Sequence, residues 1–274
     1  MIQRVLVWFI HFNPKTKRWF WRKWYNYFAK KSWGLNFRFM NYGYTDDGFN
    51  LNLKKSDEKE RYPIQLYHHT ATQVDITKKD VLEIGSGRGG GSSYVFRYLN
   101  PKSVTGLDIS SDAVELCRSI YNETELSFVE GDAENICLEP NTFDVVLNVE
   151  SSHCYGDINM FLSEVERVLK PGGVFLWSDF RTQLEMKRFF SQFLNTGLVK
   201  IKEKNITPNI IGGLNMLSVF RKEKINKHVP RLFQSVFKSY AGIEGGDVYR
   251  AFLEGDLVYK SASFKKTINH RKTK

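Results

Sequence analysis

The stretch DVLEIGSGRGGGSSYVFRYL, Asp80–Leu99, decides the fold of this chain. A short apolar run leads into a burst of glycine, and the glycines lead directly into a helix-like segment. Glycine permits positive φ and lets a ligand approach the backbone closely, and a helix start offers free N–H groups. Gly85, Gly87 and Gly89 have G-x-G-x-G spacing, while Gly90 fills the sixth position. Spacing alone therefore leaves a dinucleotide open as the ligand.

Apolar runs alternate with helix-like segments from Asp80 onward. The expected strands read VLEIG, VTGLDIS, LSFVEGD, FDVVLNVE and GGVFLWSDF, followed by Val199–Asn205 and Asp256–Phe264. The expected helices cover Ser92–Leu99, Asp112–Asn122, Ile158–Leu169 (ending at KPGG), Leu184–Asn195 and about 213–240. This alternation predicts an α/β fold with a parallel sheet that carries helices on both sides.

The N-terminal part differs in composition from the rest of the 274 residues. Residues 1–44 contain five of the six tryptophans, and no Asp or Glu precedes Asp46 in a chain of net charge +10. We therefore divide the chain into a basic aromatic extension, 1–44, and one domain, 45–274. Basic termini suggest an acidic partner, either membrane phosphate or nucleic acid.

The extension has an amphipathic pattern between Lys17 and Phe28. On a helical projection, basic residues gather opposite aromatic ones. That pattern predicts a helix in the headgroup region of an anionic membrane, through residues 1–40, or a lid on the protein's own core; both remain open.

The cysteines and the hydropathy of the chain indicate its cellular compartment and whether it binds a metal. Cys117, Cys137 and Cys154 lack CxxC spacing, which favours a reducing compartment over disulfides or zinc. No histidine–carboxylate cluster suggests a metal. No apolar run is long enough to span a bilayer. We expect a cytoplasmic protein, with peripheral membrane association as an additional possibility.

Two carboxylates follow the glycine turn at strand ends. Asp108 ends the second strand about 20 residues on, where it can accept both hydroxyls of a ribose. Asp132 ends the third strand and can accept a hydrogen bond from an adenine amino group. Each signal is weak alone, and together they predict an adenosine-containing cofactor.

The order of these motifs resembles class I S-adenosylmethionine-dependent methyltransferases. VLEIGSGRGG, GLDIS, EGDAEN, FDVVLNVESSH and EVERVLKPGGVF carry the resemblance over about Tyr42 to Asp179. It implies a doubly wound, Rossmann-like, mostly parallel seven-stranded sheet, S-adenosyl-L-methionine as cofactor and S-adenosyl-L-homocysteine as product. It also implies cofactor contacts, which are Glu83, Gly85, Ser86 and Gly87 toward the methionine end, Asp108 on ribose, Ile109 on adenine, Asp132 and Ala133 at the adenine edge, and Asn148 beside the amino-acid portion.

A closer resemblance is to methyltransferases of lipid-like substrates. RGGGSSYVFRYLNPKSVTGLDIS and NVESSHCY look like the phthiotriol-type O-methyltransferases, with sterol C-methyltransferases more distant. FMNYGYTDDG resembles the aromatic segment that closes over the cofactor in this group, so Tyr42 and Tyr44 are expected as lid residues.

The acceptor end has three candidate catalytic residues. His153 lies just beyond the fourth strand, at the sheet edge where ligands bind, and an imidazole suits general-base work. Glu150 is a second candidate, and Asp179, at the end of the fifth strand, faces the acceptor or caps the following helix.

Three functions remain open from the sequence. The first is O-methylation of a hydrophobic, lipid-like or secondary-metabolite hydroxyl, with His153 as the base. The second is C-methylation of a sterol or isoprenoid-like alkene, whose carbocation needs carboxylates and aromatic faces. The third is a cofactor-binding protein that interacts with membrane or RNA; nucleic acid is disfavoured, because NVESSH replaces the NPPY-like segment expected for a planar nitrogen.

Overall fold

The computed structural model describes residues 38–49, 51–229 and 241–268, together with Arg231, Gln234 and Lys238. The amphipathic helix expected within Lys17–Phe28 lies outside the described residues.

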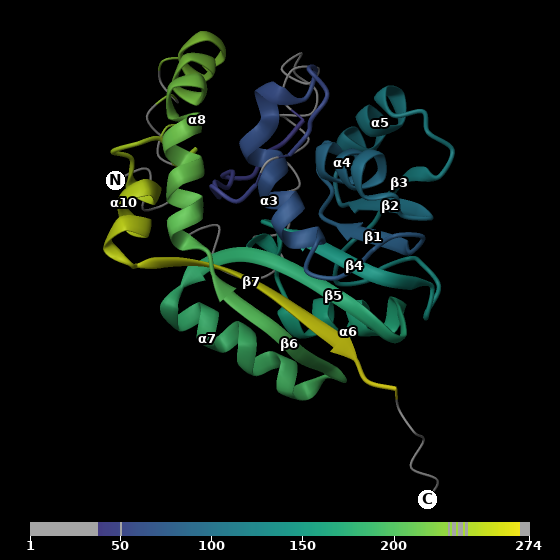
Figure 1. Cartoon of the computed structure of the whole chain (residues 1–274). Coiled ribbons are helices and arrows are strands. Elements are labelled where there is room, and N and C mark those ends of the chain that lie inside the picture. Colours follow the sequence, from purple (N-terminus) through teal and green to yellow (C-terminus); the bar gives the residue numbers. More distant parts are fainter. Residues whose placement is uncertain are drawn as a thin grey trace, which may run out of the picture.

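A seven-stranded sheet of order β3-β2-β1-β4-β5-β7-β6 forms the centre of the protein (Figure 1). Strands β1 to β5 are parallel to one another, and β7 runs antiparallel to both β5 and β6. The strands are β1 (Asp80–Ile84), β2 (Ser103–Asp108), β3 (Leu126–Glu130), β4 (Phe143–Val149), β5 (Leu169–Thr182), β6 (Leu198–Asn205) and β7 (Leu257–Lys266). The predicted doubly wound, mostly parallel sheet is confirmed.

Helices cover both faces of this sheet (Figure 1). On one face lie α3 (Arg61–Ala71), α4 (Gly90–Leu99), α5 (Ser111–Ile120), α8 (Thr207–His228) and α10 (Asp247–Glu254), and on the other lie α6 (Ile158–Val168) and α7 (Gln183–Gln192). The short 3-10 turns are η2 (Glu58–Glu60), η3 (Ser152–Cys154) and η4 (Phe193–Asn195).

The central strands are apolar at nearly every position because both faces are buried. Val81 and Val145 point into the core under α3 and α4, whereas the next residues, Leu82 and Val146, point into the core over α6. Consecutive side chains of a strand face opposite ways, so two separate cores fix the register of the sheet.

Three helical predictions need correction. The sequence analysis did not identify α3 or α10, and α8 begins at Thr207 rather than near residue 213. The stop signal KPGG does end α6 at Val168, but its residues then form an irregular start of β5, where the pairing with β4 shifts register.

The described end of the extension is packed onto the domain. Tyr44 donates its N–H to Tyr62 O at 3.0 Å, and Thr45 donates to Asn209 O at 3.0 Å. Phe39, Tyr42 and Tyr44 are buried. The described residues on both sides of the proposed boundary after residue 44 therefore pack onto the same domain.

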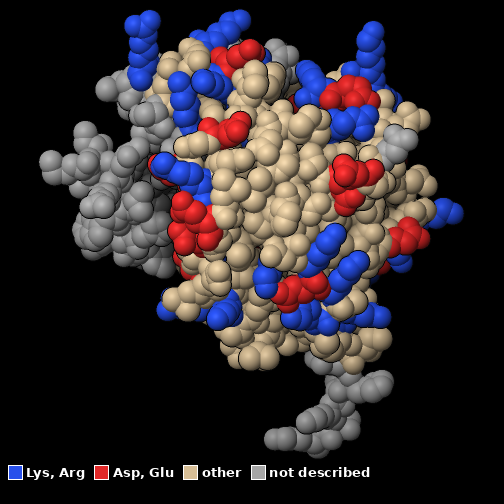
Figure 2. All heavy atoms as spheres, turned by 60° about the vertical axis from the view of Figure 1, so that its left-hand side comes forward, with Lys and Arg blue, Asp and Glu red and all other residues tan. Residues whose placement is uncertain are grey.

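Charges of both signs are interspersed on the face seen in Figure 2, around a broad area without charged side chains. Within the described ranges, no helix is both long enough and apolar enough to cross a bilayer.

Candidate active site

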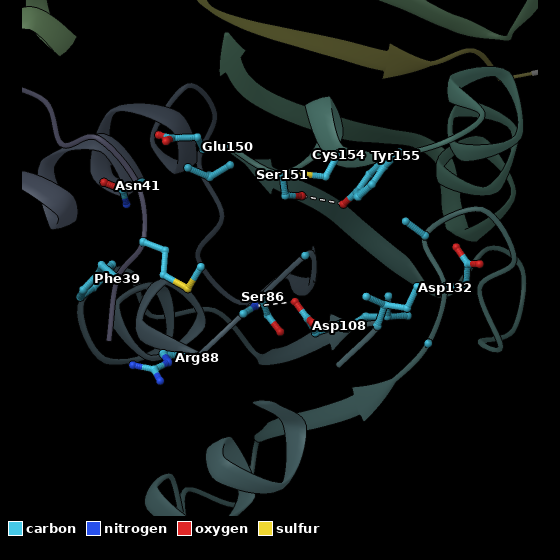
Figure 3. Close-up of a pocket in the computed structure, with 18 of the residues that line it drawn as sticks. Phe39, Asn41, Ser86, Arg88, Asp108, Asp132, Glu150, Ser151, Cys154 and Tyr155 are labelled. Atoms are coloured by element: carbon cyan, nitrogen blue, oxygen red, sulfur yellow. Dashed lines mark hydrogen bonds between the residues drawn. The ribbon is translucent and has the colours of Figure 1, made fainter. Parts of the chain in front are cut away.

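A cavity lies at the carboxyl ends of β1, β2, β3 and β4 (Figure 3). The space not occupied by protein atoms is about 900 Å³, counting the part open to solvent. Its lining comes from four strand ends and two other segments. These residues are Arg38–Asn41, Tyr67, Gly85–Arg88, Leu107–Ile109, Gly131–Glu134, Val149–Ser151, Cys154 and Tyr155.

The glycine turn forms one wall of the cavity, and its three glycines have different functions. All three have positive φ, which is 78° at Gly85, 52° at Gly87 and 72° at Gly89. A Cβ on Gly85 would lie 2.2 Å from Ser151 Oγ, and one on Gly89 would lie 2.7 Å from the Tyr121 ring. A Cβ on Gly87 would meet nothing within 4 Å. Gly87 is therefore the position where an external group can approach the backbone.

Asp108 lies across from this turn, at the end of β2. Its Oδ2 accepts the Gly87 N–H at 2.7 Å, and its Oδ1 accepts the Ser110 N–H at 2.9 Å. Burial raises the pKa of Asp108, although both backbone donors counteract the rise. Ile109 lines the cavity beside it.

Asp132 and Ala133 line the neighbouring strand end, next to Asp108 in Figure 3. Asp132 Oδ1 accepts the Glu134 N–H at 2.9 Å, which fixes the turn after β3. The cavity thus brings together both acidic residues that the strand ends predicted.

Glu83 and Asn148 were expected at the cofactor, but neither lines the cavity. Buried Glu83 accepts the Tyr67 hydroxyl at 2.7 Å, and it is Tyr67 that reaches the cavity. Burial raises the pKa of Glu83 to about 7, against the effect of hydrogen bonds from Ser92 and Tyr67. Glu83 therefore supports a lining side chain from behind.

Asn148 has the same supporting position on the other side. Its Nδ2 donates to Ile84 O at 2.9 Å, to Ser151 Oγ at 2.9 Å and to Tyr155 Oη at 3.0 Å. Ser151 and Tyr155 both line the cavity, and their hydroxyl oxygens are 2.6 Å apart. Asn148 holds the loop after β4 in place.

The aromatic segment FMNYGYTDDG does reach the cavity, but through other residues than expected. Phe39, Met40 and Asn41 line it. Phe39 and Asn41 lie on the side opposite Asp132 in Figure 3. Tyr44 is fully buried instead, and it stacks on His69 with ring centroids 4.7 Å apart. Tyr42 is buried against Phe180.

The three candidate catalytic residues cluster where β4 and β5 end. His153 lies on η3, and its Nδ1 is 2.8 Å from Oδ1 of the fully buried Asp179. Asp179 Oδ2 also accepts the Ser152 hydroxyl at 2.7 Å and the His153 N–H at 2.9 Å. Thr182, not Asp179, caps α7. Asp179 is thus placed to orient His153 and does not line the cavity.

His153 carries a strongly perturbed pKa. Burial opposes its charged form, but Cys154 and the carboxylate of Asp179 outweigh burial and raise the pKa to about 10. His153 itself is absent from the cavity wall, although Ser151 and Cys154 on either side of it are part of that wall. Its ring packs on Phe180, with centroids 4.5 Å apart.

Glu150 faces the cavity from a strained backbone. Its φ of 50° lies in the left-handed region, which residues other than glycine seldom adopt. Burial raises its pKa to about 8, opposed by the hydrogen bond from the Tyr42 N–H and by the charge of His153. Such strain is concentrated at functional sites.

Comparison with known proteins agrees with this architecture. A family model described as "Methyltransferase domain" matches residues 82–177. The phthiotriol/phenolphthiotriol dimycocerosates methyltransferase of Mycobacterium tuberculosis is 37% identical over 255 residues, which cover 93% of this chain and 94% of that protein. The chain belongs to the S-adenosylmethionine-dependent methyltransferases.

Other members show the same relationship. The fatty-acid O-methyltransferase of Mycolicibacterium smegmatis is 39% identical over 217 residues, covering 79% of this methyltransferase and 77% of that protein. The crystal structure of the geranyl diphosphate C-methyltransferase of Streptomyces coelicolor, in complex with Mg²⁺, geranyl diphosphate and S-adenosyl-L-homocysteine, superposes with a TM-score of 0.66 at 13% identity. It covers 92% of this chain and 98% of that one, which shows a shared fold.

The cavity of this methyltransferase fits S-adenosylmethionine. The open side of Gly87 allows backbone approach, and Asp108 and Asp132 place two carboxylates on adjacent strand ends for ribose and adenine. Ser86 Oγ is buried without a hydrogen-bond partner among the described residues, so a polar atom is available at the turn. Asp108, Asp132 and the Gly87 backbone would hold the adenosine part.

Several lining residues were missed by the sequence analysis. Tyr67 and Arg88, together with Glu134, Cys154 and Tyr155, line the cavity without having been singled out. A usable signal was present at Tyr67, because the helical spacing of Ile64, Tyr67 and Ala71 predicts helix α3.

Proposed function

We propose that this methyltransferase methylates an oxygen atom of a hydrophobic, lipid-like acceptor, and that His153 acts on that oxygen. The observation that carries the proposal is the His153–Asp179 pair at the end of β4, next to the cavity. S-adenosylmethionine, when bound, supplies an activated methyl group. The protein must align the acceptor and, for a hydroxyl, accept its proton.

Asp179 prepares His153 for this task. The contact between Asp179 and Nδ1 fixes the orientation of the imidazole ring. Phe180 gives the imidazole an apolar neighbour, which suits a hydrophobic acceptor. The relatives' names mention a triol and a fatty acid. A hydroxyl acceptor needs neutral His153 as a base, whereas a carboxylate acceptor needs only a hydrogen-bond donor.

The test combines His153→Ala with labelled S-adenosylmethionine and paired acceptors, a long-chain alcohol and a fatty acid. With the alcohol, turnover should fall about 10²–10⁴-fold while the affinity for S-adenosylhomocysteine stays unchanged. If the His153→Ala variant methylates both acceptors at the wild-type rate, His153 has no part in the mechanism. Leu194→Ala, at an exposed site on η4, is the control.

C-methylation is a second candidate, favoured by one group of side chains. The rings of Tyr42, Phe180, Phe252 and Tyr259 contact one another beside the Glu150 carboxyl. Aromatic faces and a carboxylate stabilise carbocations. An isoprenoid alkene as acceptor, with mass spectrometry to locate the labelled methyl on carbon or oxygen, distinguishes the two reactions.

We also propose that the basic aromatic extension contacts an anionic membrane from which the acceptor enters. Basic residues near such a surface contribute about 1 kcal/mol each. The full chain should sediment with phosphatidylserine vesicles, less so at high salt. The triple substitution Arg18→Glu, Arg22→Glu and Lys23→Glu should leave it in solution, and equal sedimentation would leave only the lid interpretation.

A further inference from the structure

A single peptide bond in the cavity wall is held at one end by a guanidinium group and at the other by a carboxyl group. The peptide joins Asn41 to Tyr42. Its carbonyl oxygen, on Asn41, accepts a hydrogen bond from Arg221 Nη2 at 2.6 Å. Its N–H, on Tyr42, donates to Glu150 Oε2 at 2.9 Å. The guanidinium thus faces the negative end of the peptide dipole, and the carboxyl oxygen faces its positive end.

The buried guanidinium of Arg221 donates hydrogen bonds to backbone carbonyls. Its side chain is 8% exposed, and Nη1 donates to Ala241 O at 2.9 Å. Among the described residues no Asp or Glu forms an ion pair with it. A buried guanidinium is costly to desolvate, so its position against the cavity wall calls for a functional explanation.

Arg221 is the last of four residues on one face of α8 that hold the same segment. Asn209, Gly213, Leu217 and Arg221 are spaced four apart and therefore share a face. Asn209 exchanges hydrogen bonds with Thr45, accepting at 3.0 Å and donating at 2.8 Å.

The two middle residues of this face leave no space. A Cβ on Gly213 would lie 2.5 Å from the Gly43 carbonyl carbon, and a Cβ on Gly43 would lie 2.8 Å from Leu217 Cδ1. Helix α8 therefore follows residues 41–45 in close contact along more than three turns.

The clamped peptide connects three parts of the site. Residues 39–41 line the cofactor cavity, Glu150 lines it from the end of β4, and Arg221 belongs to α8, in the segment between β6 and β7. Glu150 is itself fixed from β7 by the Tyr259 hydroxyl at 3.1 Å. Loss of the clamp would free the cavity wall without removing any of the lining side chains from 39–41.

We propose that Arg221 and Glu150 are positioning residues that hold residues 39–41 against the cofactor and so determine its affinity. The proposal rests on the cofactor site and not on the acceptor, so it stands or fails separately from the proposed oxygen chemistry. It follows that a change at Arg221, which lies more than two turns along α8 from the end of β6, is transmitted to the cofactor cavity.

The first test is calorimetry of S-adenosylhomocysteine with Arg221→Met, which keeps the length of the side chain and removes its donors. Loss of a hydrogen bond to a charged group corresponds to a weakening of roughly 10- to 100-fold. Arg221→Lys, which can still donate to one carbonyl, should recover part of the affinity. The matched control is Arg250→Met, because Arg250 is exposed on α10 and should leave binding unchanged.

Kinetics separate positioning from simple loss of folded protein. In the Arg221→Met variant, the KM for S-adenosylmethionine should rise by the same factor, while kcat at saturation stays within about threefold. A merely structural effect would lower the binding stoichiometry and kcat and leave KM and the dissociation constant unchanged. That result would overturn the proposal.

Hydrogen exchange gives a reading even if Arg221→Met does not fold. In the wild-type protein, S-adenosylhomocysteine should slow amide exchange in the peptide that contains Tyr42, because the ligand and the clamp hold the same segment. Glu150→Gln, which keeps an acceptor oxygen, should exchange like the wild type, and Glu150→Leu should exchange faster. Unchanged exchange on ligand addition would refute the clamp.

Discussion

The pairing of His153 with Asp179 makes a quantitative prediction about pH. The pKa of His153 is raised to about 10, so at pH 7.5, or 2.5 units lower, only about one molecule in 300 carries the neutral imidazole. If the neutral form removes the proton from a hydroxyl acceptor, kcat/KM should rise about tenfold per pH unit between 7 and 9. A carboxylate acceptor has no proton to lose, so its rate should be flat over this range.

Asp179→Asn is the perturbation that tests the cause. Without the carboxylate charge, the pKa of His153 should fall below about 10, although Cys154 still opposes the effect of burial. The variant's profile with an alcohol should then level off at a lower pH than that of the wild type, so its pH 9 to pH 7 ratio drops below about 100. The base is also weaker, so the limiting rate at high pH should be lower than that of the wild type.

The assay is transfer of labelled methyl to a long-chain alcohol and to a fatty acid, from pH 6.5 to 9.5. Removal of one partner from a buried pair costs about 3–5 kcal/mol, and Arg181, 3.3 Å from Asp179, also loses its partner. Urea denaturation must therefore confirm that the variant is folded, with the exposed Asp247→Asn as control. A flat wild-type profile with the alcohol would refute His153 as the base without any variant.

Three further predictions concern the cavity. Asp108→Ala should weaken S-adenosylhomocysteine binding roughly tenfold or more by calorimetry, because a charge-assisted partner of ribose is lost; unchanged affinity would refute that role. Gly87→Ala should weaken the same binding while its added Cβ meets no protein atom within 4 Å, so any loss of affinity beyond that of Gly245→Ala reflects the cavity rather than backbone strain. Glu150→Gln tests how the free energy of unfolding depends on pH. The pKa of Glu150 in the folded wild type is about 8, above the ordinary value of 4.5. The stability that protonated Glu150 contributes is therefore complete below pH 4.5 and is lost as the pH rises through 8. Relative to the variant, the wild type should lose on the order of a few kcal/mol between pH 5 and 8.5 in urea denaturation, and parallel curves would show that Glu150 is ionised in the fold throughout.

The strand ends could be predicted from the sequence because they depend on local signals. Glycine after VLEI, and acidic residues after the next two strands, indicate which edge of the sheet holds the ligand, and Gly87, Asp108 and Asp132 do line the cavity. The direction of a side chain is not such a signal. Glu83 lies on a strand of the site, but it points to the α3 side, and only the packing of Tyr67 explains why.

Contacts between distant segments could not be predicted from the sequence for a related reason. Tyr42 and Tyr44 have the composition expected of a lid, yet the segment turns so that Phe39 and Asn41 line the cavity and the tyrosines are buried. That turn depends on α8, more than 160 residues later, whose face from Asn209 to Arg221 holds the segment. No local pattern records such a pairing.

These long-range contacts suggest why the acceptor side and the cofactor side of this enzyme should respond to each other. Helix α8 lies in the segment between β6 and β7, and its Arg221 holds the Asn41–Tyr42 peptide that Glu150 holds from β4. Three residues beyond Glu150 is His153, whose orientation depends on Asp179 within β5. An acceptor that displaces α8 would therefore move the part of the cavity wall at residues 39–41 through Arg221. Coupling between two binding events is reciprocal. A cofactor that fixes this part of the wall would therefore favour the position of α8 that the acceptor requires. Arg221→Met should accordingly reduce the effect of bound S-adenosylhomocysteine on acceptor affinity, whereas loss of His153 should leave that coupling intact.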